Sequence, residues 1–198
     1  GEGGLDLGKL MQDPQVQAMM KQMMSQERPQ GKAAADGRSY VNETLGFSLK
    51  IPEAAKDWKL QPKPPAPASV IVTNDAEQAQ VNIVTQNLPL AMPIESMGAM
   101  IEMGPKMAMQ DYKKISAGLI ETDGKKGYEM QYEGTAAGQR LRSIQRVYIV
   151  GSTMIVVTAM APLEKWEKNE KAFTELLKNF SFIEPKQEKK AAPDKPEV

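Results

Sequence analysis

The chain has 198 residues, of which 41% are hydrophobic and 25% are charged, enough for one medium-sized domain with appendages. Lys plus Arg and Asp plus Glu number 25 each, so the formal net charge is zero and the composition lacks the basic field typical of nucleic-acid-binding proteins. Cysteine and histidine are both absent from the sequence, which excludes disulfides, thiolate and imidazole metal sites, and Ser-His-Asp or Cys-His triads within this chain.

The hydropathy of the sequence and its first residues give an expectation for the cellular compartment of the protein. No apolar run approaches the ~20 residues that a membrane-spanning helix needs. The chain begins with Gly1 and shows no basic and apolar segments of a targeting signal. We therefore expect a mature or truncated chain whose leading segment, a signal peptide or lipoprotein leader, has been removed. Such a protein would lie in the periplasm or be held at a membrane by a lost lipid anchor.

Residues 10–24 (LMQDPQVQAMMKQMM), the N-terminal segment, predict an amphipathic helix. Asp13 is a favourable N-cap, and Pro14 suits the first helical position. Apolar side chains then follow the spacing of one helix face: Val16, Met19, Met20, Met23 and Met24. An apolar face left in water would be adhesive, so we predict that it binds another protein or a second copy of the chain.

The N-terminal segment also resembles the Asp-Pro helical modules of heat-shock organising co-chaperones, in DPQVQ followed by paired methionines. That resemblance implies a carrier of hydrophobic peptides. It covers about one helix of a module that has several. Beyond it, the Pro, Gly and small residues up to residue 38 predict a linker.

A domain of antiparallel strands is predicted from residue 39 onward. Alternating apolar residues in 40–52 (YVNETLGFSLKIP) predict a β-hairpin. The proline-rich residues 61–68 predict an irregular loop, because proline cannot donate to a sheet ladder. Two further strands are expected at 69–73 (SVIVT) and 80–86 (QVNIVTQ).

Residues 93–110 have helical spacing, and Gly104-Pro105 is expected to break or kink this helix. Met97, Met100 and Met103 repeat every third residue, which places thioethers on adjacent helical turns, a geometry that suits Cu(I). The alternative is that these flexible side chains fill gaps in a core or cover a groove.

The second half of the domain predicts more strands and a final helix. Ile115, Ala117 and Leu119 are expected to alternate inward in the first of these strands. The run 153–160 (TMIVVTAM) is apolar on both parities, so it should lie at the centre of the sheet, covered on both faces. A helix after Pro162 carries a wide apolar stripe: Trp166, Phe173, Leu176, Leu177 and Phe180.

The predicted domain organisation has three parts. Residues 1–38 hold the methionine-rich helix and its linker, and residues 39–183 form the main domain. Residues 184–198 are charged and proline-rich, and we expect them to be disordered.

Arg140, Arg142 and Arg146 share one parity of a predicted strand and are candidates for an anion-binding stripe. A turn at residues 135–138 would place Glu133 opposite Arg140 and Gln131 opposite Arg142. Cross-strand pairing would then neutralise most of the stripe, which favours a solvated and paired surface.

Signatures of catalysis are missing. Glu164, Glu167 and Glu170 alternate with lysines on the last helix, as on an ordinary solvated face. No glycine-rich loop has the spacing of a phosphate-binding or dinucleotide-binding motif. The sequence therefore predicts a non-enzymatic protein without a cofactor, and an enzyme of unknown class is the least favoured alternative.

Three stretches of the sequence carry a resemblance to a known family: 40–52, RVYIVGSTMIVVTAMAP (146–162) and AFTELLKNFSF (172–182). Together they resemble the PsbP-like superfamily, which includes the DcrB-type bacterial lipoproteins. The resemblance covers about residues 39–183. It implies an α+β fold, an antiparallel sheet with helices packed on its faces in an α-β-α sandwich, and a non-enzymatic accessory role in binding another protein. Because the chain has no histidine, it resembles the extracytoplasmic bacterial branch more than the photosystem protein.

Overall fold

The computed structural model describes residues 12–15, 17–18, 21, 31–61 and 63–184. Within them the large sheet has the antiparallel order β4 (Lys59–Gln61), β5 (Ala68–Asn74), β6 (Ala79–Asn87), β10 (Thr153–Pro162), β9 (Gln139–Val150), β8 (Lys125–Ala136) and β7 (Gln110–Thr122). The small sheet has the order β1 (Lys32–Ala33), β2 (Ser39–Asn42), β3 (Phe47–Lys50) and β11 (Phe180–Phe182). Within residues 31–61 and 63–184 the helices are α3 (Gly98–Ala108) and α4 (Leu163–Lys178), with short 3-10 helices η1 (Asp75–Glu77) and η2 (Ile94–Ser96).

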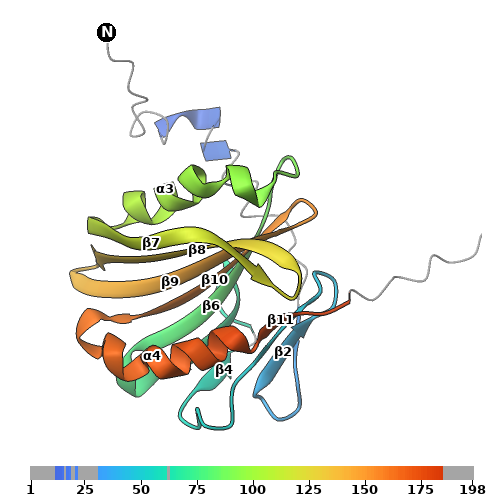
Figure 1. Cartoon of the computed structure of the whole chain (residues 1–198), viewed down its shortest axis with the longest axis vertical. Coiled ribbons are helices and arrows are strands. Elements are labelled where there is room, and N and C mark those ends of the chain that lie inside the picture. The colour runs from blue at the N-terminus through green and yellow to red at the C-terminus, as the bar shows by residue number, and fades with distance from the viewer. Residues whose placement is uncertain (1–11, 16, 19–20, 22–30, 62, 185–198) are drawn as a thin grey trace, which may run out of the picture.

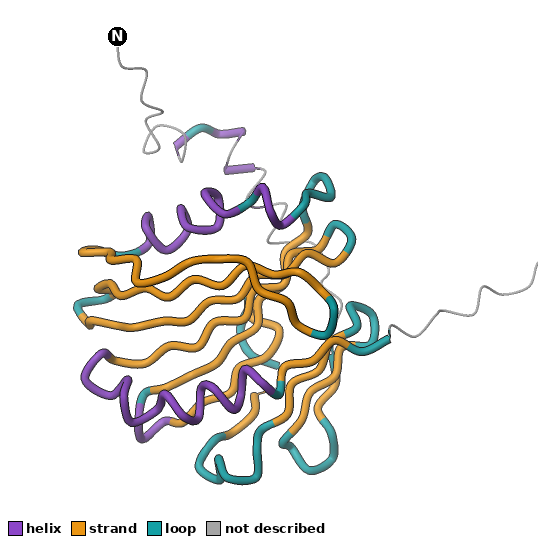
Figure 2. Tube along the Cα trace, in the orientation of Figure 1, coloured by secondary structure: helices purple, strands orange, loops and turns teal. Residues whose placement is uncertain are grey.

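The two α-helices lie on opposite faces of the large sheet (Figure 1). Helix α4 packs on β6, β10 and β9, whereas α3 packs on β7 and β8. The strands therefore form a middle layer between the helices, drawn in orange in Figure 2. This arrangement confirms the predicted α+β class with an antiparallel sheet, and the small sheet adds a layer that the sequence did not predict.

The larger core lies between α4 and the large sheet. The predicted apolar stripe of this helix is confirmed, because its aromatic and leucine side chains are all buried: Trp166, Phe173, Leu176, Leu177 and, just beyond the helix, Phe180. Strand β10 contributes Ile155, Val157 and Ala159 to the same core. It pairs with β6 on one side and β9 on the other, which confirms the predicted central position of the run 153–160. The predicted cover on both faces is wrong, because Met154, Val156 and Met160 are only half-buried on the face that α3 leaves open.

Tight turns set the register of the long strands β7, β8 and β9. Asp123 and Gly124 have φ values of 50° and 76°, and Ala137 and Gly138 have the same pair of values. Positive φ at both central residues defines a type I′ turn, whose twist matches that of the strands it joins. Each of these turns therefore reverses the chain between two neighbouring strands, and Asp-Gly at residues 123 and 124 is a typical sequence for such a turn.

The small sheet joins the large one through an aromatic cluster. Tyr148 of β9 is fully buried, and its ring stacks on Phe180 at a centroid distance of 5.5 Å and meets Phe182 edge-on at 5.0 Å. Its hydroxyl lies 2.8 Å from Thr122 Oγ1. Gly127 lies directly across the strand pair, where a Cβ would come within 2.6 Å of the Tyr148 ring, so only glycine leaves room for this aromatic side chain.

The predicted inward orientation of Ile115, Ala117 and Leu119 is wrong. Strand β7 is an edge strand, and all three side chains are exposed, with Leu119 at 56%. The register with β8 shifts between Lys114 and Ser116, so Ile115 is an extra residue in a β-bulge. The bulge interrupts the simple alternation on which the prediction rested.

Gly104-Pro105 does not break the helix, and the alternative of a kink stays a prediction. Helix α3 runs without interruption from Gly98 to Ala108 with Pro105 inside it. The proline ring is buried, and its carbonyl accepts a hydrogen bond from Met109 N at 3.0 Å. Proline removes only one intrahelical donor, and packing of its ring compensates for that loss in this last stretch of the helix.

Several predictions concern residues outside the described ranges. Within the N-terminal segment, Asp13 Oδ1 accepts a hydrogen bond from Gln15 N at 2.8 Å, as a helix N-cap does. The predicted apolar face lies outside the described residues, as do residues 185–198 of the tail; its members are Val16, Met19, Met20, Met23 and Met24. The division of the chain at residues 38 and 183 stays a prediction.

Candidate binding groove on the large sheet

Helix α3 covers one half of its face of the large sheet and leaves the other half open. A groove of about 580 Å³ follows the boundary, with β6, β10, β9 and β8 as its floor and α3 as its wall. Small and apolar side chains of the helix face it: Met97, Met100, Ile101, Gly104, Pro105 and Ala108. We call this cavity the α3 groove. Its volume lies within the usual range of ligand-binding sites.

The lining of the α3 groove carries no Asp, Glu, Lys or Arg, although these residues make up 25% of the chain. Its polar groups are the neutral side chains of Asn82, Gln86, Gln145, Thr158 and Tyr132. The remaining floor is apolar. A neutral lining of this kind does not attract phosphate or carboxylate groups, so the chemistry of the groove suits an apolar ligand with a few hydrogen-bonding groups.

One polar atom of the floor has no partner among the described residues. Gln145 Oε1 is buried and accepts no hydrogen bond there. A buried amide oxygen without a donor is unfavourable. A ligand that supplies a donor at this point, such as a hydroxyl, an amide or an indole N–H, would satisfy it.

Methionines extend the apolar surface from the groove onto the outside of α3. Met100, Met103 and Met107 are 53%, 43% and 47% exposed. With 100° between successive helical residues, these three positions lie within about 60° of one another and form one stripe. Methionine adapts its shape to different apolar partners, and it is common on surfaces that bind peptides.

A polar network anchors the opposite side of α3 to the sheet. Glu102 accepts hydrogen bonds from the Tyr128 hydroxyl at 2.8 Å and from Lys114 Nζ at 3.1 Å. These bonds, the one from Tyr128 first, lower the pKa of the Glu102 carboxyl. Burial and the hydrogen bond to Glu102 raise the pKa of Tyr128 to about 12. The network therefore holds the wall of the groove in place at neutral pH.

The lowered pKa of Glu102 predicts a pH-dependent contribution to stability. A carboxyl whose pKa is depressed by folding stabilises the protein above its unfolded pKa of about 4.3, and this contribution disappears as the pH falls through the folded value. We expect Glu102→Gln to be less stable than the wild type by a constant amount between pH 6 and 8. Urea titrations followed by circular dichroism should show that this difference shrinks steadily as the pH falls below about 4.3. A difference that stays constant as the pH is lowered through the acid range would contradict the assigned role.

The three methionines proposed as Cu(I) ligands differ in how deeply their side chains are buried. Met97 is fully buried, Met100 lines the α3 groove and is half exposed, and Met103 is exposed outside the lining. Met109, Met154 and Met160, which the sequence did not single out, also line the groove. Thioether binding of Cu(I) stays a prediction. Among the described residues, no group of three or more acidic, histidine or cysteine side chains is placed to hold a metal ion.

The three arginines of the predicted anion-binding stripe are paired within the chain. Arg140 donates to Glu133 at 3.3 Å, Arg142 to Gln131 at 3.4 Å, and Arg146 to Glu129 at 2.7 Å. The guanidinium of Arg142 also lies over the Trp166 ring, 5.1 Å from its centre. The expected cross-strand pairing is thus confirmed; Glu133 and Glu129 neutralise part of the stripe, whereas Gln131 is uncharged.

The register behind these arginine pairs differs from the predicted one. Glu133 lies opposite Arg142, and Arg140 lies opposite Thr135. The turn is centred one residue later than predicted, so the hydrogen bonds from Arg140 and Arg142 run diagonally between the strands.

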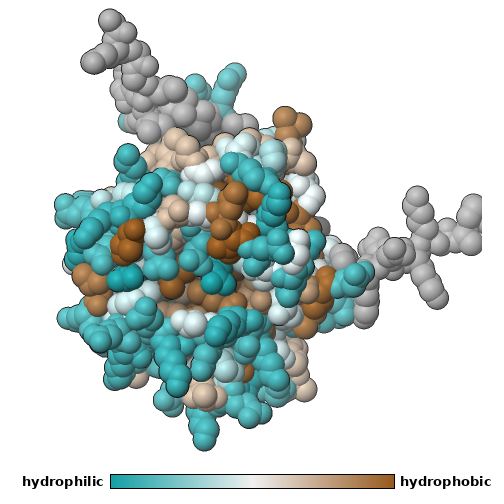
Figure 3. All heavy atoms as spheres, in the orientation of Figure 1, coloured by the Kyte–Doolittle hydropathy of each residue, from teal (hydrophilic) through white to brown (hydrophobic). Residues whose placement is uncertain are grey.

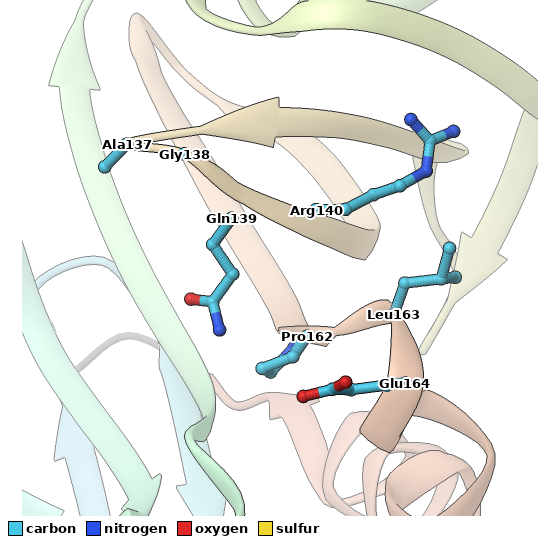
Figure 4. A pocket seen from close by; sticks show the side chains of 7 residues that line it. All are labelled: Ala137, Gly138, Gln139, Arg140, Pro162, Leu163 and Glu164. Atoms are coloured by element: carbon cyan, nitrogen blue, oxygen red, sulfur yellow. The ribbon is translucent and has the colours of Figure 1, made fainter.

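A second hollow, of about 610 Å³, lies between the β8–β9 turn and the start of α4. Figure 4 shows that the Arg140 side chain points away from Gln139 and Glu164 at this site. Its lining contains one carboxylate, Glu164, and one guanidinium, Arg140, so it offers no paired set of catalytic groups. The α3 groove is the stronger candidate.

Sequence reasoning missed the polar floor of the α3 groove. Asn82, Gln86 and Thr158 belong to runs that were interpreted as ordinary strands. The available signal was the alternation in β6, where polar side chains occupy the parity opposite to Val81 and Ile83. Polar residues on one face of a central strand indicate a face that is only partly covered.

The fold and groove define a class of antiparallel α+β proteins with helices on both faces of the sheet. The sequence matches the PsbP family model over residues 35–182, and the chain therefore belongs to the PsbP family. No curated protein sequence matches it.

Solved structures of other proteins share the fold, among them one cyanobacterial and one mycobacterial protein. Cyanobacterial PsbP (CyanoP) from Synechocystis sp. PCC 6803 has a TM-score of 0.57 at 14% identity, with 79% of this chain and 100% of that chain covered. LpqN of Mycobacterium tuberculosis, described as involved in cell envelope biogenesis, has a TM-score of 0.55 at 9% identity, with 83% and 96% covered. In the part of the chain that the structure describes, no helix has the length and apolarity required to cross a bilayer.

Proposed function

We propose that this chain is a non-enzymatic extracytoplasmic accessory protein, and that the α3 groove binds an apolar segment of a partner protein. The observation that carries the proposal is the lining of the groove, which has no charged residue and continues into the exposed methionines of α3. Apolar grooves of this kind accept amphipathic helices, whose side chains enter the groove at intervals of three and four residues.

The geometry of the sheet favours a helix as the bound element. Helices pack on sheets through apolar faces, and their diameter with side chains is about 10–12 Å. Helix α3 packs on β7 and β8, and β10 and β6, which lie beyond β9 in the sheet, present half-buried side chains such as Met154 and Asn82. A partner helix placed there would lie alongside α3 and complete the helical layer on this face.

The extracytoplasmic part of the proposal rests on the family. LpqN, which has the same fold, is described as involved in cell envelope biogenesis. The PsbP-like resemblance of the sequence also pointed to lipoproteins outside the cytoplasm. The same resemblance supports a role without catalysis, since it carries no catalytic motif.

The methionines of the N-terminal segment are proposed as a second contact with a partner. Val16, Met19, Met20, Met23 and Met24 would extend the apolar surface beyond the groove. The alternative in which Met97, Met100 and Met103 bind Cu(I) has one observation in its favour, because several thioethers line a single groove.

Fluorescence anisotropy of a labelled amphipathic peptide, rich in leucine and methionine, measures binding to the α3 groove. Gly104→Trp should weaken binding at least tenfold, because an added Cβ at this position meets nothing within 4 Å and the indole would occupy the groove. Lys106→Trp introduces the same side chain at an exposed position outside the lining and should bind like the wild type. Failure of the wild type to bind, or equal binding by Gly104→Trp, would overturn the proposal.

A further inference from the structure

Strand β7 forms the edge of the large sheet and pairs with β8 alone. Its residues 113–119 are all exposed, so neither face of this part of the strand is buried. Hydrophobic side chains reach the surface on the face of the molecule along which β7 runs (Figure 3). A free edge exposes unpaired backbone donors and acceptors, and the partner that satisfies them is another β-strand.

The two halves of β7 differ in their protection against such pairing. The first half has register shifts between Gln110 and Lys113 and between Lys114 and Ser116, and Asp111 has a φ of 51°. Bulges and lysines are the usual devices that prevent edge pairing. The second half, 116–122, pairs regularly with β8 and contains no lysine, proline or bulge.

The turn at Asp123-Gly124 fixes which backbone groups of this half face outward. Thr122 and Lys125 flank the two-residue turn and form a hydrogen-bonded pair, as in other hairpins with such turns. Hydrogen-bonded and non-hydrogen-bonded pairs alternate along antiparallel strands. Glu121, Leu119 and Ala117 therefore direct their N–H and C=O groups away from β8, toward the free edge.

We propose that residues 116–122 pair with the same residues of a second copy, about a two-fold axis at Leu119. The regular segment is centred on this residue, so this register uses its full length. Leu119 then faces Leu119 of the second copy through outward-directed backbone groups, and Ala117 faces Glu121. A closed two-fold interface of this kind requires only one self-complementary surface.

The side chains fit the same register. Leu119 is 56% exposed and would be covered by its own counterpart. Gly118 would lie opposite Ile120 of the second copy. An added Cβ at Gly118 meets nothing within 4 Å, so the described residues give no packing reason for glycine in the middle of this strand. Glycine within a strand often marks a place where another backbone approaches closely.

Sedimentation equilibrium on the full chain tests the proposal. Pairing of one short strand buries little surface, so we expect a weak dimer whose population rises with protein concentration from a 21.8 kDa monomer. Leu119→Pro removes an outward N–H that β8 does not use, and Leu119→Lys adds a charge at the axis. Both variants should remain monomeric at concentrations where the wild type dimerises.

Leu90→Lys is the matched control, because Leu90 is 72% exposed and lies outside β7. This variant should dimerise like the wild type, as should a chain with Met19, Met20 and Met23 all changed to Ser. Circular dichroism verifies that each variant is folded. A wild type that stays monomeric at millimolar concentration, or a Leu119→Lys variant that dimerises equally well, would overturn the proposal.

Discussion

Phe173→Ala is expected to lower the free energy of unfolding by about 3–5 kcal/mol. Phe173 is fully buried in the core beneath α4, where its ring packs between two tryptophans. The ring centroids lie 5.7 Å from Trp58 and 5.1 Å from Trp166. Alanine would leave a cavity between two large rings that cannot collapse to fill it. Urea unfolding followed by tryptophan fluorescence measures the loss directly.

Lys171→Ala on the same helix provides the control for Phe173→Ala. Lys171 is exposed, and alanine is a strong helix former, so this change should alter stability by less than about 0.5 kcal/mol. A loss below about 1 kcal/mol for Phe173→Ala would mean that the aromatic cluster is not the centre of the core.

Tyr148→Ala should have an effect of similar size, about 3–5 kcal/mol, and should also loosen the small sheet. Tyr148 is the residue of the large sheet on which Phe180 and Phe182 of β11 pack. Its removal takes away the surface that orders β11 and, through backbone pairing, β3. Hydrogen exchange measured by NMR should therefore accelerate at Phe47–Lys50 more than in β10.

Tyr148→Phe separates the ring from the hydroxyl. The phenylalanine variant keeps the stacked ring and removes the contact with Thr122, so it should lose only about 0.5–1.5 kcal/mol. Exchange in the small sheet should stay slow in this variant. Equal acceleration in both variants would show that the hydroxyl, and not the ring, joins the two sheets.

Local patterns in the sequence predicted most of the strands and the covering helices. The spacing of neighbouring apolar residues is enough to identify three of these elements, without information on distant residues. They are the hairpin around Phe47, the central run 153–160 and the apolar stripe of α4. Asp123-Gly124 is likewise a residue pair typical of the I′ turn that it forms. The family resemblance then supplied the way in which these elements are assembled.

Features that depend on the partner strand were not predictable in the same way. The bulge at Ile115 arises where the register between β7 and β8 shifts. The residue types in Lys113–Ser116 do not predict it. The turn between β8 and β9 was placed one residue early because several small residues in succession allow more than one position. Gly138 at the second central position was the signal for the actual I′ turn.

The α3 groove could not be predicted because it depends on how much of the large sheet α3 covers. Its lining combines α3 with four strands, and the gap exists because α3 lies over β7 and β8 while the sheet extends further. Sequence periodicity reports that a residue faces a given side of the sheet. It does not report how far a helix reaches across that side.

The absence of charge in the α3 groove has a consequence for the rate at which it is filled. Charged interfaces accelerate encounter by electrostatic attraction, and their association slows as salt is added. A groove lined by methionines and amides offers no such attraction. Partners should therefore associate at about 10⁵–10⁶ M⁻¹s⁻¹ with little dependence on ionic strength, and the lifetime of the complex would set the differences between one partner and another.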